Sequence, residues 1–321
     1  MVGCGFVLLA GVGATQMVPR ADAGVSPHGR IGIYLTSHGV LKPDVLEPAL
    51  AAVEAGRIDT FVINAKNMHG ELTYTSAIPL ASEINASTGR LDLRQLVAGL
   101  RRRGVYTIAR QVLFYDPKLA RYLGSEAAWV SPADERVVAY NLAVACEIAE
   151  LGFDEIQFDY VRFADGGDLL PIYEDRYAAV NGFLQEAAKR LTGRVALSAD
   201  VFGRVLWNWN VKRIDPIGQS LEDISAHLAI VSPMVYPSHY REAYYQEDPH
   251  RVVSEALTTG AGRIATPLRP FLQAFDRAIP PGMSLEAYIR AQIRAALESG
   301  ADGYLFWNPT CEYEALYQAL D

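Results

Sequence analysis

The chain has 321 residues, of which 50% are hydrophobic, a formal net charge of −8 and a pI near 5.3. This length and composition are typical of one large globular domain or two small ones. The negative charge argues against a nucleic-acid partner, because the chain has no basic field that would attract phosphates.

Residues 1–28 are predicted to form a signal-like or disordered segment. A short apolar run, Phe6–Ala14, precedes the sequence ADA at 21–23, which has the small-x-small form of a signal cleavage site. No Lys or Arg precedes the run, so a disordered N-terminus is the alternative. We expect export to the periplasm, the envelope or the medium. The run is too short to span a membrane comfortably, and no later segment approaches about 20 apolar residues.

From residue 29 onward, helical stretches end on a glycine and a short strand follows. The glycines that fit the left-handed position after a helix are Gly56, Gly104, Gly152, Gly193 and Gly300. One helix start is also visible, because Ser131, Pro132 and Asp134 form a capping-box pattern before apolar residues at helical spacing.

Eight strands are predicted, and helical stretches separate them. They are Ile31–Thr36, Thr60–Lys66, Val105–Val112, Glu155–Val161, Val195–Val201, Leu228–Tyr236, Arg269–Phe275 and Gly303–Asn308. This alternation predicts a parallel sheet, and eight units within residues 29–321 match a single-domain α/β fold, the (β/α)₈ or TIM barrel. The alternative is a doubly wound open sheet, but no GxGxxG follows the first strand.

The links from strand to helix are long and rich in polar and aromatic residues. They cover residues 67–91, 163–174 and 201–219. In a barrel these links gather at the carboxyl ends of the strands, where active sites are built. We therefore expect the functional residues at this end.

The stretch GFDEIQFDYVRF, residues 152–163, carries an acid inside an apolar strand. Ile156, Phe158 and Tyr160 alternate with Gln157 and Asp159, so the two sets point to opposite faces. We expect the apolar set to face the helices and Asp159 to face the barrel interior near its open end. Other strands also end in polar residues, and unpaired buried polar groups cost about 1–3 kcal/mol each, so a ligand site is predicted.

Asp159 and Asp200 end neighbouring predicted strands. Paired carboxylates are what glycosidic cleavage needs, one as the acid and the other as nucleophile or base. We predict Asp159 as nucleophile or base and Asp200 as the acid, which requires a raised pKa at Asp200. The alternative is that both form ion pairs that only maintain the barrel.

The predicted substrate-binding residues lie at strand ends and in the loops that follow. They are Tyr34, Lys66, Arg110, Gln157, Arg162, Trp207, Tyr236, His239, Gln273, Trp307 and Asn308. Arg110, Lys66 and Tyr236 are expected to orient Asp159 and the substrate hydroxyls, while Trp207 and Trp307 stack on sugar rings.

No metal and no other cofactor is predicted. The histidines show no HxH or HExxH spacing, and no GxSxG motif is present. Cys4, Cys146 and Cys311 are too few and too scattered for a disulfide framework or a zinc site, so free thiols are expected.

Several motifs in order carry a family resemblance across residues 32–309. They are GIYLTS, LTYTSAIPLA, IARQVLFYDP, GFDEIQFDYVRF, SADVFG, SPMVYPSHY, RPFLQAF and GYLFWNP. With them the chain resembles a bacterial family of glycoside hydrolase domains that have a TIM-barrel fold and are often exported. The resemblance implies a barrel that hydrolyses a polysaccharide or cell-envelope glycan.

Two positions depart from related patterns. The second strand reads NAKN, with Asn64 and Asn67 where many relatives have aspartates, and Val161 stands where chitinase-type barrels have a catalytic glutamate. The second departure disfavours a substrate-assisted chitinase mechanism. The asparagines of NAKN leave open a second function, a barrel of the cell envelope that binds carbohydrate without catalysis. A third possibility is a hydrolase or lyase that acts on a non-sugar substrate.

Overall fold

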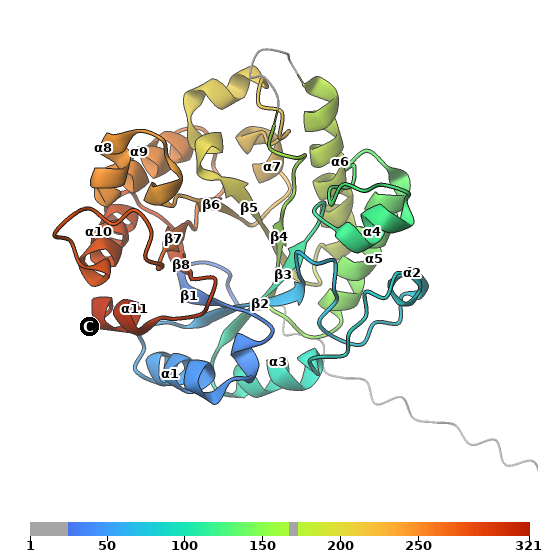
Figure 1. Cartoon of the computed structure of the whole chain (residues 1–321), viewed down its shortest axis with the longest axis horizontal. Helices are drawn as coiled ribbons and strands as arrows, with labels where there is room; N and C mark the ends of the chain where they lie inside the picture. The colour runs from blue at the N-terminus through green and yellow to red at the C-terminus, as the bar shows by residue number, and fades with distance from the viewer. Residues whose placement is uncertain (1–24, 167–172) are drawn as a thin grey trace, which may run out of the picture.

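The computed structural model of the chain describes residues 25–166 and 173–321 (Figure 1). The signal-like run and the ADA sequence predicted from the sequence lie outside these residues. In the part of the chain that is described, no helix has both the length and the apolar character needed to cross a membrane.

Within the described residues, eight parallel strands close into one barrel in the order β1 to β8. The strands are β1 (Arg30–Leu35), β2 (Thr60–Lys66), β3 (Tyr106–Val112), β4 (Glu155–Asp159), β5 (Ala196–Phe202), β6 (Ile230–Met234), β7 (Phe271–Gln273) and β8 (Gly303–Trp307). Pairing of β1 with β8 completes the closure. The predicted (β/α)₈ barrel is confirmed, because each predicted strand is present with its ends moved by at most a few residues.

The helices surround the strands (Figure 1). The α-helices are α1 (Pro43–Glu54), α2 (Pro79–Glu83), α3 (Leu93–Arg102), α4 (Pro117–Tyr122), α5 (Glu135–Ala149), α6 (Glu174–Leu191), α7 (Leu221–Ser225), α8 (Ala243–Glu247), α9 (Pro249–Ala261), α10 (Leu285–Glu298) and α11 (Glu314–Ala319). Short 3₁₀ turns are η1 (Gly39–Leu41), η2 (Gly203–Leu206), η3 (Asn208–Lys212) and η4 (Pro237–His239).

The predicted helix ends are confirmed, but the predicted helix start is wrong. The five glycines named above all have positive φ angles, between 69° and 98°. Helix α5 begins at Glu135, and its N-cap is Asp134, whose carboxylate accepts from the Arg136 N–H. The Ser131 hydroxyl accepts from Ala133 N–H instead, so it belongs to the preceding turn.

The core between barrel and helices follows the two-residue alternation of the strands. Ile156 and Phe158 on β4 are fully buried, and the Phe158 ring packs edge-on against Phe183 of α6 at 5.5 Å between centroids. These two side chains therefore face the helices, as predicted.

The amino-terminal end of the barrel is closed by a buried ion pair between Glu155 and Arg269. The Tyr106 hydroxyl donates to Glu155 at 3.1 Å, and Arg269 Nη1 donates to the Pro27 carbonyl at 3.2 Å. Residues 26–28, which the sequence placed in the N-terminal segment, thus make contacts with the barrel. Any substrate must reach the interior from the opposite, carboxyl end of the strands.

Candidate active site

A cavity of about 670 Å³ lies at the carboxyl end of the barrel. Its walls come from β3 to β8 and the loops that follow β4 to β7. The predicted site residues that line it are Arg110, Asp159, Arg162, Asp200, Tyr236, His239 and Trp307. A second hollow of about 570 Å³ shares four of the lining residues and includes Asn308. The two hollows are therefore adjacent at the barrel mouth.

Asp159 ends β4 with its carboxylate held on both oxygens. Arg110 Nε donates to Oδ2 at 2.9 Å, Arg110 Nη2 also contacts Oδ2, and the Tyr160 N–H donates to Oδ1 at 2.6 Å. Burial alone would lower the pKa of Arg110, but the Asp159 carboxylate raises it above its ordinary value. Arg110 is thus a permanent cation, and Asp159 is its ion-pair partner.

Tyr160 lines the cavity, contrary to the prediction that it faces the helices with Ile156 and Phe158. Its φ angle is 53°, so the backbone turns at the end of β4 and the alternation stops there. A left-handed conformation costs a residue other than glycine about 1–3 kcal/mol and is found preferentially at functional sites. Here it directs the Tyr160 N–H back to the Asp159 carboxylate.

Asp200 lies on β5 next to Asp159. The register pairs Phe158 with Ala199, so the following residues, Asp159 and Asp200, occupy neighbouring positions on adjacent strands. Asp200 is 2% exposed, and its Oδ1 has no hydrogen-bond partner in the described part of the chain. Burial and the nearby Asp159 charge raise the pKa of Asp200 well above its ordinary value, against the opposing effect of Arg110. Asp200 therefore retains its proton at higher pH than an exposed carboxyl.

The aromatic wall of the cavity is built on Trp307 and Tyr236. Trp307 stacks on Tyr34 at 3.9 Å between centroids, with the Arg110 guanidinium 5.1 Å from the Trp307 ring. Burial and the charge of Asp200 raise the pKa of Tyr236 well above its ordinary value, so its hydroxyl remains a neutral donor. Tyr34 lies behind this wall, and its hydroxyl accepts from Asn64 Nδ2 at 2.7 Å.

Lys66 does not line the cavity, and its predicted role in orienting Asp159 is corrected. Its ammonium group is fully buried, pairs with Asp116 at 2.7 Å and donates to Asn141 of α5 at 2.9 Å. The register of β2 with β3 shifts between Asn64 and Lys66. This irregularity breaks the two-residue alternation, so Asn64 faces the interior while Lys66 faces the helices.

The two asparagines of NAKN have different surroundings. Asn64 bridges two interior residues, because its Oδ1 accepts from Arg110 Nη1 at 2.8 Å and its Nδ2 donates to Tyr34. Asn67 closes a turn, in which its Oδ1 accepts from His69 N–H and Glu71 N–H at 2.9 and 3.1 Å. Asn64 thus contacts the residue that holds Asp159, whereas Asn67 belongs to the loop after β2.

Three further predicted residues lie outside the main cavity. Gln157 is buried deeper in the barrel, where its amide donates to the Ser232 hydroxyl at 3.1 Å. Gln273 connects the loops after β6 and β7, since it accepts from Ser238 N–H at 3.2 Å and donates to the Arg277 carbonyl at 2.8 Å. Asn308 holds the turn after β8 through its bond to the Glu312 carbonyl.

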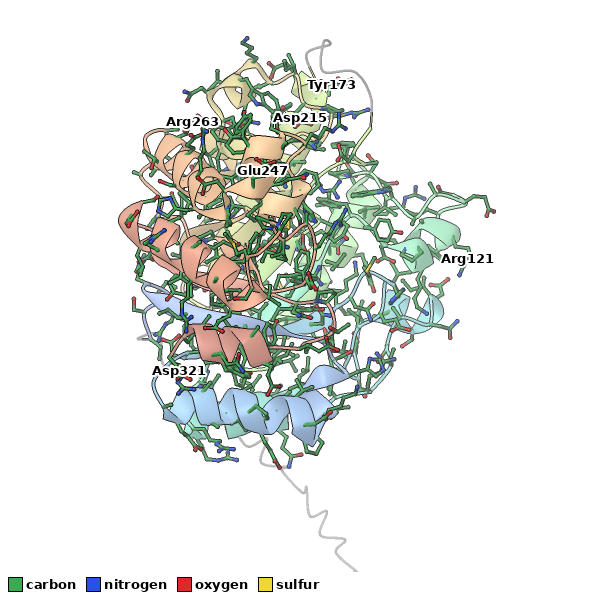
Figure 2. All side chains as sticks on the ribbon, turned by 60° about the vertical axis from the view of Figure 1, so that its left-hand side comes forward. Arg121, Tyr173, Asp215, Glu247, Arg263 and Asp321 are labelled. Atoms are coloured by element: carbon green, nitrogen blue, oxygen red, sulfur yellow. The ribbon has the colours of Figure 1, made fainter. Side chains whose placement is uncertain are left out.

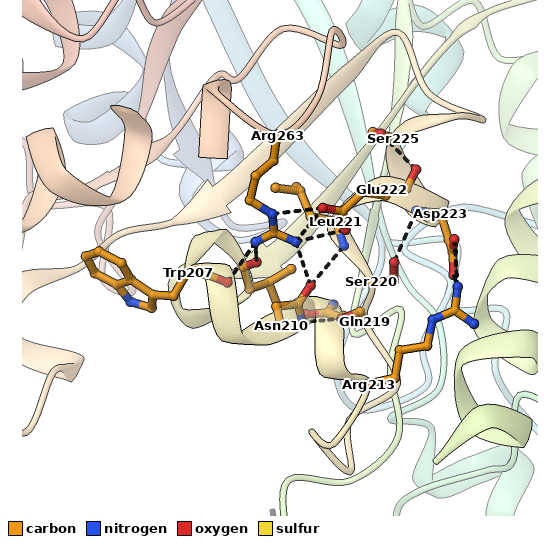
Figure 3. A network of polar contacts seen from close by, with 11 residues as sticks. Trp207, Asn210, Arg213, Gln219, Ser220, Leu221, Glu222, Asp223, Ser225 and Arg263 are labelled. Carbon is orange, nitrogen blue, oxygen red and sulfur yellow. Dashed lines mark hydrogen bonds and ion pairs between the residues drawn. The ribbon is translucent and has the colours of Figure 1, made fainter. Parts of the chain in front are cut away.

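Trp207 also lies outside the residues that line either hollow. Its ring stacks on Tyr245 at 5.9 Å, and Arg263 Nη1 donates to its carbonyl at 2.8 Å (Figure 3). Arg263 also pairs with Glu222 of α7 at 2.8 Å. Figure 2 shows Arg263 and Asp215 in the part of the molecule away from Asp321. The contacts of Arg263 with Trp207 and Glu222 fix the loop after β5, which forms one wall of the cavity.

Gly203 follows β5 at a place where a side chain does not fit. A Cβ atom would lie 2.5 Å from the Tyr240 hydroxyl and 2.8 Å from the Met234 carbonyl oxygen. Gly203→Ala is therefore expected to lower the free energy of unfolding by about 1–3 kcal/mol, measured by urea denaturation. Gly182→Ala is the control, since no atom lies within 4 Å of its added Cβ. Equal stability of the two variants would contradict this packing.

Sequence reasoning missed several lining residues, among them Arg241 and Arg277. Both follow the ends of strands, β6 and β7, so the rule that placed functional residues in these loops could have identified them. The position of Tyr160 had no comparable signal, because its positive φ is not encoded by a glycine.

The comparisons with known proteins agree with this barrel. A PgaB (BpsB) glycoside hydrolase domain from Bordetella bronchiseptica superposes with a TM-score of 0.64 at 15% identity, over 90% of this chain and 98% of that one. The endo-β-1,4-mannanase of Thermotoga petrophila gives 0.60 at 13% identity, over 88% and 68%. The spore cortex-lytic enzyme SleL of Bacillus cereus gives 0.58 at 12%, over 91% and 73%. At these identities the similarity establishes the fold.

Sequence comparison establishes the family. No curated protein matches the chain significantly. A family model described as "Putative glycosyl hydrolase domain" matches residues 32–313, which include strands β2 to β8, most of β1 and the residues of the cavity. The protein therefore belongs to this family of glycosyl hydrolase domains.

Proposed function

We propose that the protein hydrolyses glycosidic bonds in a polysaccharide or cell-envelope glycan, with Asp200 as the acid and Asp159 as the nucleophile. The observation that carries the proposal is the unequal state of two neighbouring carboxyls in one cavity. Asp159 is paired with Arg110, whereas burial and the charge of Asp159 raise the pKa of Asp200. Such a separation of environments is the pattern of an acid and a nucleophile sharing one site.

The mechanism follows from this arrangement. Asp200 donates its proton to the glycosidic oxygen as the bond to the leaving sugar breaks, and Asp159 forms an ester with the anomeric carbon. Water then attacks the same carbon, Asp200 takes its proton, and Asp159 is released. Neighbouring strands lie about 4.8 Å apart, which supports the separation of about 5–5.5 Å found in retaining enzymes. Arg110 and the Tyr160 N–H keep the carboxylate in place during both steps.

The test is the release of new reducing ends from a panel of glycans, with the anomer of the first product followed by NMR. We expect hydrolysis with retention of configuration. Because the pKa of Asp200 is raised, kcat/KM should fall on the alkaline side as Asp200 loses its proton, at a pH above the ordinary carboxyl range. An alkaline limb that persists in Asp200→Asn would contradict the assignment.

The second candidate is a carbohydrate-binding barrel without catalysis. The observation in its favour is Asn64, a neutral amide that contacts Arg110 at a position where the family resemblance leads us to expect an acid. A glycan array combined with the reducing-end assay separates the two functions, because a binder retains sugar without releasing new ends.

For either function we propose that the protein is exported, on the basis of the apolar run and ADA sequence before the barrel.

A further inference from the structure

The cavity is positively charged although the whole chain is acidic. Five arginines and three aspartates line it, whereas the chain carries a net charge of −8. One aspartate, Asp200, has a raised pKa, so it loses its proton at a higher pH than an exposed carboxyl. The excess of cations is thus a local property of the proposed substrate site. Whether these cations can bind a substrate depends on which of them are already paired within the protein.

Two of the five arginines are neutralised within the protein. Arg110 pairs with Asp159. Arg204 pairs with Asp165 at 2.7 Å and with Asp215 at 2.8 Å. The other three, Arg162, Arg241 and Arg277, form no ion pair with any of the described residues. They are the cations that remain available to a bound molecule.

Arg162 is the best placed of the three, because it is 8% exposed and still lines the cavity. Its guanidinium lies 4.5 Å from the Trp129 ring centroid and 4.3 Å from that of Phe202. These rings pack against the guanidinium, but they carry no formal negative charge. Of its five N–H donors, one bond to a described residue is found, from Nη1 to the Phe163 carbonyl at 3.0 Å.

A purely structural role does not explain this arrangement. The charges of Asp159 and Asp165 act on Arg162 without forming an ion pair with it, and they do not offset the effect of burial. A buried charge without a paired counter-charge is unfavourable, and an apolar side chain could fill an aromatic cage without that cost. Burial indeed lowers the pKa of Arg162 below its ordinary value. Arginine is the side chain suited to bind a planar carboxylate or a sulfate with two parallel hydrogen bonds.

We propose that the natural substrate is an acidic glycan, with the carboxylate or sulfate of one sugar bound by Arg162 and assisted at the cavity rim by Arg241 and Arg277. This inference rests on the proposed function and names its substrate class. Arg162 follows Asp159 by three residues on the same wall of the cavity, so the anionic sugar occupies a position beside the bond that is cleaved.

The experiment compares matched substrates. Polygalacturonate and alginate carry carboxylates, carrageenan carries sulfates, and mannan and chitin carry neither. Carboxyl-reduced polygalacturonate differs from its parent only by conversion of each carboxylate to a hydroxymethyl group. The wild type is expected to favour one acidic class by about 10- to 100-fold in kcat/KM, mainly through KM, since a hydrogen bond to a charged group is worth about 1.5–3 kcal/mol.

Arg162→Gln should remove that preference, Arg162→Lys should restore part of it, and Arg190→Gln should leave it unchanged. Arg190 is an exposed residue of α6 that pairs with Glu186 on the same helix. Preference for carboxylates or for sulfates distinguishes the two sources of negative charge. Equal activity on polygalacturonate and its reduced form, with no preference for carrageenan over neutral glycans, would overturn the inference while the proposed hydrolysis stands.

If no glycan is hydrolysed, the proposed function fails, and the inference is then decided by binding. Isothermal titration with acidic and neutral oligosaccharides of equal length measures this directly. Tighter binding of the acidic series, lost in Arg162→Gln, would support the acidic site. Equal or weaker binding of the acidic series would overturn it.

Discussion

Asp200→Asn is expected to slow the hydrolysis of unactivated glycans by about 10²- to 10⁴-fold, the usual contribution of a general acid. The amide cannot give a proton to the leaving oxygen. It has nearly the shape of the protonated carboxyl that burial favours at this position, and Asp200 forms no ion pair with the described residues. The loss should therefore appear in kcat without a loss of folded protein.

A comparison of leaving groups separates an acid from a nucleophile at this position. Dinitrophenyl glycosides need little protonation as they leave, so Asp200→Asn should cleave them at close to the wild-type rate in the first step. Loss of activity by the same factor on activated and unactivated substrates would show that Asp200 does not act as the acid.

The stability of this variant should depend on pH in a defined direction. A folded-state pKa raised above the unfolded value means that the folded protein binds the proton more tightly. Asp200 thus contributes stability below its unfolded pKa, about 3.9, and that contribution is lost as the pH rises through the folded value. Asn does not titrate, so urea denaturation should show Asp200→Asn gaining stability relative to wild type as the pH rises from 4 to 7.

Asp159→Asn is expected to abolish detectable hydrolysis and to lower stability as well. Its amide cannot form the ester, and Arg110 would remain as a buried cation without a counter-charge. Removal of one member of a buried ion pair costs about 3–5 kcal/mol, although the Asn oxygen can still accept a hydrogen bond from Arg110. Activity must therefore be measured at a temperature where circular dichroism shows the variant to be folded.

Asp116→Asn provides the matched control. Asp116 is also fully buried and pairs with a cation, Lys66, but it lies outside the cavity. This variant should lose stability to a similar extent and keep the kcat of its folded fraction. If it loses kcat as Asp159→Asn does, the effect at Asp159 reflects stability and not chemistry.

The strands and their polar ends could be predicted because the relevant signals are local. Alternation with a period of two marked β4, and glycines after helices marked the connections, so Asp159 and Asp200 were placed at strand ends. Alternation fails where the backbone departs from regular geometry. The irregularity between Asn64 and Lys66 turned Lys66 to the helices, and the φ of 53° at Tyr160 turned that ring into the cavity.

By itself, the sequence determined the barrel, its open end and the two carboxyls that meet there, since each of these depends on patterns a few residues long. Only the tertiary structure decided which charges are neutralised. Arg110 meets Asp159 across 49 residues of chain, and Arg204 meets Asp165 across 39, while Arg162 forms no ion pair with any of the described residues. Pairing and desolvation depend on which distant side chains become neighbours, so the raised pKa of Asp200 and the unpaired arginines follow from the closed barrel alone.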